Sequence, residues 1–199
     1  MSDSILEISH ANAATIIISF GGCKSKLGGI LPFECLRSLQ DWFPRVDLKF
    51  IIDKNFAHYH KGIDGVSTNI DDTIKFIRNK ILGYKKVIFV GISAGGYAAI
   101  LFGSLLNVNH VVAFIPQTIL NKAYANKYTN LAPLINKTTD YKIYGDTAVT
   151  DISDNHHQSH VRNIDNFKNV HAIYIYGISL PRMRDSGKLR AIISSCINS

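Results

Sequence analysis

The residues from 86 to 101 (KVIFVGISAGGYAAIL) constrain the fold more than any other part of the chain. An apolar, β-branched run leads into Gly91-Ile92-Ser93-Ala94-Gly95, and small residues follow at once. This Gly-x-Ser-x-Gly pattern is typical of a sharp turn from a strand into a helix, which leaves the central serine strained and exposed. Glycine is needed on both sides because a Cβ would clash where the backbone doubles back. The sequence therefore predicts a nucleophile elbow at Ser93.

Six short apolar runs are rich in β-branched residues, at residues 15–20, 46–52, 86–91, 110–115, 141–145 and 170–176. Their near-continuous hydrophobicity is typical of strands buried on both faces of a parallel sheet. Helical patterns alternate with them, at residues 32–43, 69–82, 94–106 and 186–193. This alternation predicts right-handed βαβ crossovers, and therefore an α/β fold with a doubly wound, mostly parallel sheet.

The composition fits one compact domain over residues 1–199, because 46% of the residues are hydrophobic and no low-complexity stretch interrupts them. The apolar residues 13–18 are too few for a membrane span. Three cysteines, Cys23, Cys35 and Cys196, are an odd number without metal-ligand spacing. We interpret them as free thiols in a reducing cytoplasm, which is the location that we expect.

The formal net charge of +7 raises the question of a nucleic-acid partner. No helix-turn-helix, zinc-finger or aromatic RNA-binding signature accompanies the charge, so we expect no nucleic acid. A solvated basic surface is the simplest interpretation, and an anionic substrate is the next. Lys24 and Lys26, which follow the first apolar run, could attract such a substrate.

The elbow resembles that of the α/β-hydrolase superfamily, which includes serine esterases, lipases, thioesterases and some acyltransferases. Residues 53–62 (DKNFAHYHKG) and 91–117 also resemble a group of small, poorly characterised bacterial hydrolase-like proteins. The superfamily resemblance implies that the six strands lie in the order 2-1-3-4-5-6. It also implies that residues 116–140 form a minimal cap, in which residues 117–126 would be one helix.

In a sheet of this order, the direction in which successive strands are added reverses between the first and third strands. Ligands bind at that point, outside the carboxyl ends of the strands. Gly21-Gly22-Cys23 ends the first strand, and Ser93 ends the third. A serine nucleophile needs donors for the oxyanion that it creates. We expect these donors to be the N–H of Ala94 and that of Gly22 or Cys23.

The nucleophile also needs a base and an acid that orients the base. Asp146 and Asp151 follow the penultimate strand and are both candidates for the acid, with Asp154 beyond them. The superfamily places its histidine after the last strand. Here no histidine follows His171, which itself begins that strand at the opposite edge of the sheet, as His110 begins an earlier one.

Two groups of histidines could replace the missing one. His156, His157 and His160 follow the acid loop, and His58 and His60 follow the second strand. His58 and His60 could instead shape a substrate wall together with Tyr59. His156 and His160 have the spacing of a helical metal pair, but no third ligand is evident, so no metal and no other cofactor is expected.

Two functions remain open at this point. The first is a serine hydrolase or acyltransferase that acts through Ser93 on an ester or thioester, with a small-molecule or saccharide-linked acyl substrate. The alternative is a degenerate hydrolase-fold protein that has lost its base and binds without turnover. A third function, binding of nucleic acid, has only the net positive charge in its favour.

Overall fold

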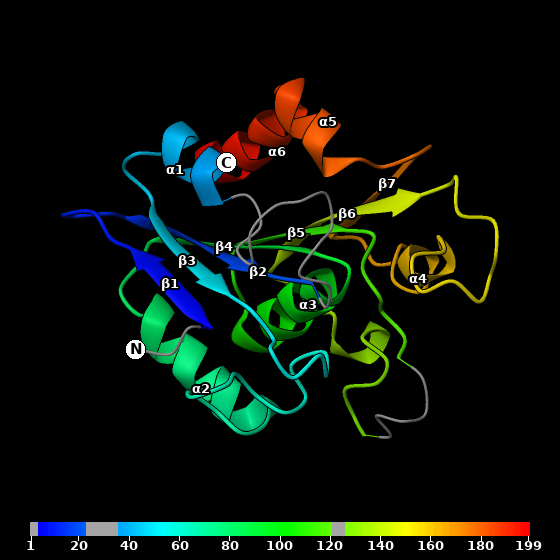
Figure 1. Cartoon of the computed structure of the whole chain (residues 1–199), viewed down its shortest axis with the longest axis horizontal. Coiled ribbons are helices and arrows are strands. Elements are labelled where there is room, and N and C mark those ends of the chain that lie inside the picture. The colour runs from blue at the N-terminus through cyan, green and yellow to red at the C-terminus, as the bar shows by residue number, and fades with distance from the viewer. Residues whose placement is uncertain (1–3, 23–35, 121–125) are drawn as a thin grey trace.

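The computed structural model describes residues 4–22, 36–120 and 126–199. They form a seven-stranded sheet of order β1-β3-β2-β4-β5-β6-β7 between two layers of helices (Figure 1). The strands are β1 (Ile5–Ile8), β2 (Thr15–Phe20), β3 (Asp47–Ile51), β4 (Lys86–Ile92), β5 (His110–Phe114), β6 (Asp140–Asp146) and β7 (Val170–Ile175). All neighbouring strands are parallel except β1, which runs antiparallel to β3.

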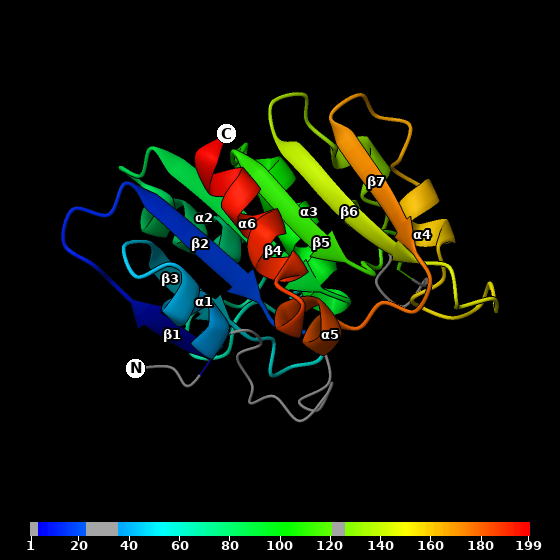
Figure 2. The same ribbon diagram turned by 90° about the horizontal axis from the view of Figure 1, so that it is seen from above.

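The helices cover both faces of the sheet. α1 (Leu36–Trp42), α5 (Leu180–Asp185) and α6 (Lys188–Asn198) lie on one face, as Figure 2 shows from above. α2 (Ile70–Ile81) and α3 (Ala94–Leu106) lie on the other, and α4 (Ser159–Arg162) lies near the β6 and β7 edge (Figure 1). A short 3₁₀ helix, η2 (Ala132–Leu134), packs against α3.

Each side of the sheet has its own hydrophobic core. Ile16, Ile18 and Phe20 of β2 pack towards α2 and α3, whereas Ile17 packs towards α1 and α6. Successive residues of a strand point to opposite faces, so a strand buried on both faces must be apolar throughout. This is the physical reason for the continuous apolar runs in the sequence.

The predicted doubly wound sheet is confirmed, and so is the predicted order of the six parallel strands. β1 was not predicted. Its four residues are only partly buried, and its Glu7 carboxylate pairs with the buried Lys49 ammonium at 2.7 Å. An edge strand of this length lacks the apolar run that marks the central strands.

The helix predictions need three corrections. The predicted helix 32–43 is α1 within the described residues, since residues 32–35 lie outside them. The predicted helix 186–193 corresponds to α6, which begins only at Lys188, after Gly187 at φ 76°, and continues to Asn198; α5, which precedes it, was not predicted. Residues 117–120 are not helical: Ile119 pairs with Asn130 in an antiparallel bridge, and residues 121–125 lie outside the described part.

Over the three described ranges, no helix is long and apolar enough to cross a membrane.

Candidate active site

Ser93 occupies the expected strained turn between β4 and α3, but the residue is buried there, at 8% exposure, and not exposed as the pattern predicts. Its φ of 55° and ψ of −121° are rarely adopted by residues other than glycine. The glycines on either side permit the turn: a Cβ on Gly91 would lie 2.1 Å from the Gly95 carbonyl oxygen, and one on Gly95 would lie 2.1 Å from that of Phe20. The Ser93 N–H donates to the Phe114 carbonyl at 3.0 Å, which ties the elbow to β5.

His156 is the histidine that the structure brings to Ser93. The Ser93 Oγ lies 2.8 Å from the His156 Nε2. His156 belongs to the loop between β6 and α4, and this loop returns to the sheet where His157 forms a parallel bridge with Asp146 at the end of β6. The bridge therefore holds the residue before His157 at the carboxyl edge, close to the elbow.

Asp154 is the carboxylate beside this histidine. Its Oδ1 accepts the backbone N–H of His156 at 2.7 Å and lies 3.6 Å from the Nδ1 of the same residue. The His156 tautomer that can accept a proton at Nε2 carries its hydrogen on Nδ1, facing Asp154. The Asp154 side chain is 46% exposed, so this carboxylate is solvated as well as close.

Asp146, the first candidate for the acid, has another set of partners. Its buried carboxylate accepts the N–H groups of Ala148, Gly177 and Ile178, each at 2.8 Å. Gly177 and Ile178 belong to the loop after the last strand. Asp146 thus anchors the loop in which the superfamily resemblance placed a histidine.

Asp151, the second candidate, lies in an exposed turn. Its Oδ1 accepts hydrogen bonds from the Ser153 N–H at 2.9 Å and the Ser153 hydroxyl at 2.7 Å. These hydrogen bonds lower the pKa of the Asp151 carboxyl. Of the carboxylates in this segment, the one that contacts His156 is therefore Asp154, which the sequence analysis mentioned without selecting.

The two other histidines of this segment face away from the serine oxygen. The His157 Nδ1 accepts the Ser159 N–H at 3.2 Å. The His160 Nδ1 accepts the Ile119 N–H at 3.4 Å, and the His160 carbonyl accepts the Thr118 hydroxyl at 2.5 Å. His160 thus joins α4 to the segment after β5, and burial lowers its pKa. In the described ranges no group of three His, Cys, Asp or Glu side chains could hold a metal ion.

His58 and His60 form a wall beside α3. Their shared neighbour is Tyr97, one helical turn after Ser93: the His58 ring meets it edge-on, and the His60 ring stacks on it, both at 5.8 Å. The His58 Nε2 also contacts the side-chain Oε1 of Gln117. The sequence leaves these residues open as a base or, with Tyr59, as a substrate wall; in the structure the two histidine rings contact Tyr97, whereas Tyr59 is fully buried in the core.

The hydrogen bonds of His60 define its neutral tautomer. The Tyr97 hydroxyl donates to the Tyr128 carbonyl at 2.9 Å, so its oxygen accepts from the His60 Nε2 at 2.8 Å. The opposite ring nitrogen, Nδ1, then accepts from the Asn126 amide at 3.0 Å. Burial, with the nearby His58, lowers the pKa of His60 to about 4, and a neutral ring agrees with these contacts.

The expected oxyanion donors lie next to the elbow. α3 begins at Ala94 without a side-chain cap, so the N–H groups of its first turn have no acceptor within the helix. A Cβ on Gly22 would lie 3.8 Å from the Ser93 Cβ, which places the Gly22 backbone against the nucleophile. Cys23, Lys24 and Lys26 lie outside the described residues.

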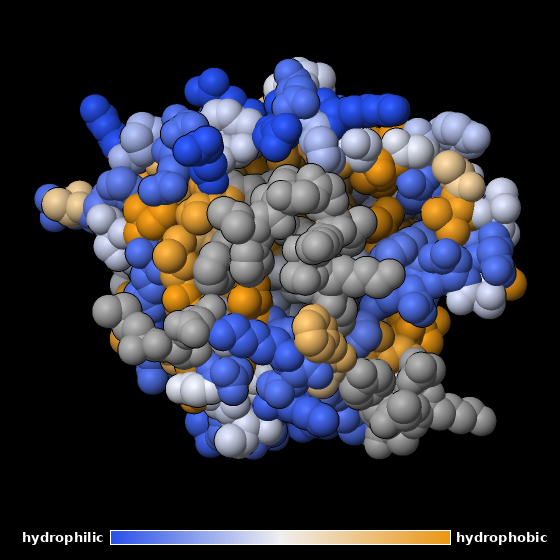
Figure 3. Space-filling view, in the orientation of Figure 1, coloured by the Kyte–Doolittle hydropathy of each residue, from blue (hydrophilic) through white to orange (hydrophobic). Residues whose placement is uncertain are grey.

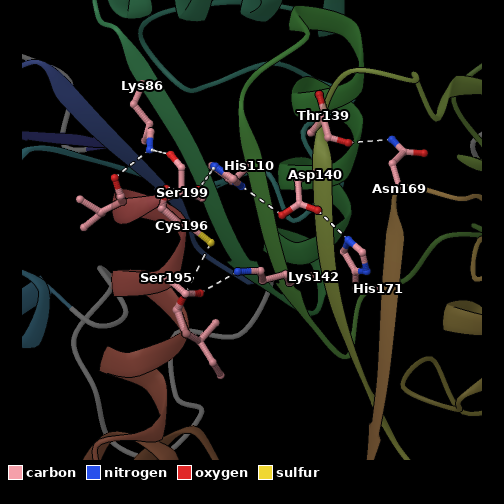
Figure 4. Close-up of polar contacts among 12 residues, drawn as sticks. Lys86, His110, Thr139, Asp140, Lys142, Asn169, His171, Ser195, Cys196 and Ser199 are labelled. Atoms are coloured by element: carbon pink, nitrogen blue, oxygen red, sulfur yellow. Dashed lines mark hydrogen bonds and ion pairs between the residues drawn. The ribbon is translucent and has the colours of Figure 1, made fainter.

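The opposite edge of the sheet holds the histidines that the sequence analysis excluded. Figure 4 shows Asp140 between His110 and His171, with Ser199 on the far side of His110. Asp140 lies 3.1 Å from the His110 Nδ1 and 2.8 Å from the His171 Nε2. These groups join the end of α6 to the amino ends of β5, β6 and β7, far from Ser93.

The loops at the carboxyl edge present a mixed surface. In Figure 3, hydrophilic residues dominate the visible face outside the grey atoms, with hydrophobic patches between them. Exposed apolar side chains follow three of the parallel strands: Phe56 follows β3, and Ile119 and Ile152 follow the neighbouring strands β5 and β6.

No protein-family model and no curated protein sequence matches the chain. Solved structures do, over nearly its whole length. The capsule O-acetyltransferase of Neisseria meningitidis serogroup A has a TM-score of 0.66 at 14% identity, over 95% of this chain and 91% of that one. An α/β hydrolase from the metagenome of lagoon sediments at Mar Chica, Morocco, has a TM-score of 0.62 at 14% identity, over 98% and 95%.

Est1E from Butyrivibrio proteoclasticus, solved with ferulic acid bound, has a TM-score of 0.59 at 13% identity, over 98% of this chain and 95% of that one. At these identities the likeness concerns the fold. The resemblance to the α/β-hydrolase superfamily is therefore confirmed as a likeness of fold: the chain has the α/β-hydrolase architecture.

Sequence reasoning missed two polar residues around the site, Asp53 and Gln117. Each is buried, and polar side chains are rarely buried without a partner. The signal in the sequence was their place at the ends of the two segments quoted for the resemblance, residues 53–62 and 91–117.

Proposed function

We propose that the protein is a serine-dependent acyl-transfer enzyme that cleaves an ester or thioester through Ser93. The observation that carries this proposal is the 2.8 Å contact between the Ser93 Oγ and the His156 Nε2. A nucleophile and a base within hydrogen-bonding reach are the minimum for covalent catalysis by a hydroxyl.

In the first half-reaction, the Ser93 Oγ attacks the acyl carbon while its proton moves to the His156 Nε2. The tetrahedral oxyanion accepts hydrogen bonds from the N–H groups of Ala94 and Gly22. His156 then gives the proton to the departing alkoxide or thiolate, and the acyl group stays on Ser93 as an ester. Asp154 stabilises the imidazolium and keeps its Nδ1–H oriented.

In the second half-reaction, water or the hydroxyl of an acceptor attacks the acyl-enzyme. His156 takes the proton of the attacking oxygen and returns it to the Ser93 Oγ as the ester bond breaks. Hydrolysis and acyl transfer differ only in this acceptor.

Two features support an acyl donor of modest size with a polar or saccharide-linked portion. The loops after β3 and β5 expose the apolar side chains of Phe56 and Ile119, and the face shown in Figure 3 is mostly hydrophilic outside the grey atoms. A capsule O-acetyltransferase of the same fold has been solved in complex with CoA. Acetyl-CoA is therefore the thioester donor to test first, beside a simple acetyl ester.

The test measures release of p-nitrophenolate from p-nitrophenyl acetate and release of free CoA from acetyl-CoA. Ser93→Ala should reduce both rates to the uncatalysed background. His156→Gln should reduce them roughly 10²- to 10⁴-fold, the range of a general base. His157→Gln is the matched control, since its imidazole binds the Ser159 N–H, and it should retain most of the activity.

An unchanged rate in Ser93→Ala would place the activity elsewhere. A folded wild type with no turnover and no acylation of Ser93 would instead favour the non-catalytic hydrolase-fold protein.

A further inference from the structure

Tyr59 lies at the end of a hydrogen-bond chain that reaches the proposed oxyanion site. It is fully buried, and its hydroxyl donates to the carbonyl oxygens of Gly21 at 2.9 Å and Ile51 at 3.0 Å. One hydroxyl proton is thus shared between two carbonyls at the ends of neighbouring strands. The Ile51 carbonyl also accepts the Gly21 N–H at 2.8 Å, so all these groups form one compact network.

The Gly21 carbonyl and the Gly22 N–H belong to the same peptide unit. The described chain has no cis peptide bond, and in a trans peptide the C=O and N–H point in opposite directions. A hydrogen bond that holds the Gly21 carbonyl towards Tyr59 therefore turns the Gly22 N–H away from Tyr59. The Gly22 backbone lies beside the Ser93 Cβ, so this direction decides whether the N–H is available to an oxyanion.

Glycine on both sides makes this peptide unit easy to rotate, because neither residue carries a Cβ that would restrict its dihedral angles. The unit therefore needs an external constraint if its N–H is to stay in one orientation. Preorganised donors stabilise a transition state because they need not reorient during the reaction.

The side chain of Tyr59 is itself held firmly. Its ring packs edge-on against Phe20, at 5.8 Å, and against Phe102, at 6.2 Å. Its backbone has a φ of 63°, a left-handed conformation that is uncommon for an aromatic residue. The buried Asp53 carboxylate maintains this conformation by accepting the N–H of Tyr59 at 2.8 Å and that of Ala57 at 2.7 Å.

We propose that Tyr59 is a positioning residue for the oxyanion site: its hydroxyl fixes the Gly21–Gly22 peptide so that the Gly22 N–H is aimed at the developing oxyanion. The inference rests on the proposed function, since it assigns a role in that same reaction. Asp53 contributes to this positioning indirectly, because its carboxylate holds the Tyr59 backbone in its strained conformation.

The oxyanion exists only in the tetrahedral state, so a misdirected Gly22 N–H weakens the transition state and leaves ground-state binding intact. Tyr59→Phe should therefore lower kcat, while KM stays within about twofold. Removing one whole oxyanion donor costs on the order of 10²–10³ in kcat. Because the N–H remains and only its constraint is lost, we expect a loss of roughly 10- to 100-fold.

Tyr141→Phe is the matched control. Tyr141 is also fully buried, and its hydroxyl bonds to the Ser104 Oγ at 2.7 Å within the core on the α3 side of the sheet. Both variants lose one buried phenol hydroxyl, so a purely structural role predicts similar thermal unfolding and similar activity for the two. The proposal predicts similar unfolding, and a low kcat for Tyr59→Phe alone.

A second measurement uses 1,1,1-trifluoroacetone, which forms a tetrahedral oxyanion adduct with an active serine. Its inhibition constant should rise in Tyr59→Phe by the same factor as kcat falls, and stay unchanged in Tyr141→Phe. Asp53→Asn retains the Tyr59 hydroxyl and should give a smaller loss of kcat in the same direction.

The outcomes separate the two claims. A wild type that turns over no ester or thioester and is not acylated at Ser93 would overturn the proposed function and this role with it. An active wild type in which Tyr59→Phe matches Tyr141→Phe in kcat would overturn the role of Tyr59 alone. A parallel rise in KM and inhibition constant without a change in kcat would also overturn it.

Discussion

At the scale of single residues, the site depends on which partner each carboxylate has. Asp146 lies where a hydrolase acid is expected, yet its oxygens are occupied by the Ala148, Gly177 and Ile178 N–H groups. The Asp154 Oδ1 lies 3.6 Å from the Nδ1 of His156, a residue only two positions later in the chain. The two carboxylates therefore have separate roles, one in the fold and one in the proposed chemistry.

Substituting each carboxylate by its amide should separate these roles. Asp154→Asn should lower kcat roughly tenfold, less than for a buried triad acid, because water can partly replace an exposed carboxylate. Asp146→Asn should lower the free energy of unfolding by about 1–3 kcal/mol, since an amide nitrogen would face a buried N–H donor. Steady-state kinetics and chemical denaturation measure the two effects, and a reversed pattern would reassign the acid to Asp146.

The neutral His60 ring predicts a pH dependence of stability. Its folded-state pKa of about 4 lies below its ordinary value of 6.5, so the unfolded chain binds more protons between these pH values. Protonation of His60 therefore has no effect on the free energy of unfolding above about pH 6.5, and lowers that free energy progressively as the pH falls towards about 4. His60→Gln should show a smaller slope of unfolding free energy against pH across this window.

His110 and His160 also have lowered pKa values, but they are present in both proteins, so the difference in slope isolates His60. Identical slopes of unfolding free energy against pH in the two proteins would show that the contacts with Tyr97 and Asn126 do not hold the His60 ring neutral.

At the scale of elements, the elbow and the Asp53–Gly62 loop meet at β2. Gly95 lets α3 approach the last carbonyl of β2, and Tyr59 bonds to the next carbonyl, that of Gly21. Two elements far apart in the chain thus contact the same short stretch of backbone. The geometry of the proposed oxyanion site therefore depends on how these two elements pack.

Gly95→Ala should disturb this junction. Its Cβ would lie 2.1 Å from the Phe20 oxygen, so α3 and β2 would have to separate. Overpacking of this kind costs typically 1–3 kcal/mol, and more against rigid backbone. We expect a lower midpoint of thermal unfolding together with a large loss of activity.

Gly83→Ala is the control, because nothing lies within 4 Å of its added Cβ. Its φ of 90° makes the substitution mildly strained, at a cost of about 1–2 kcal/mol, but activity should persist. Equal loss of activity in the two variants would show that close packing at the elbow is not required.

At the scale of the whole molecule, the sheet separates two functions between its edges. The carboxyl edge carries Ser93, His156 and the loops around them, whereas the amino edge carries the Asp140 cluster that joins the end of α6 to the sheet (Figure 4). Parallel strands bring all their carboxyl ends to the same edge, which is why residues far apart in the sequence converge on Ser93.

This arrangement also explains what the sequence could predict. The six parallel strands follow from apolar runs, and the elbow follows from glycines that local geometry requires. The short edge strand β1 has no such pattern, because its residues are only partly buried. Five histidines were candidates for the base, and the choice among them depends on the long-range bridge between Asp146 and His157, which no local pattern encodes.

Labelling by a fluorophosphonate probe tests most directly whether His156 activates Ser93, since this reagent reacts with activated serines. We expect stoichiometric labelling at Ser93 in the wild type, located by peptide mass spectrometry, and the same rate of labelling in His157→Gln. The rate of labelling should fall by about 100-fold or more in His156→Gln, as expected on loss of a general base. No labelling of the folded wild type, labelling at another residue, or an undiminished rate in His156→Gln would contradict the account.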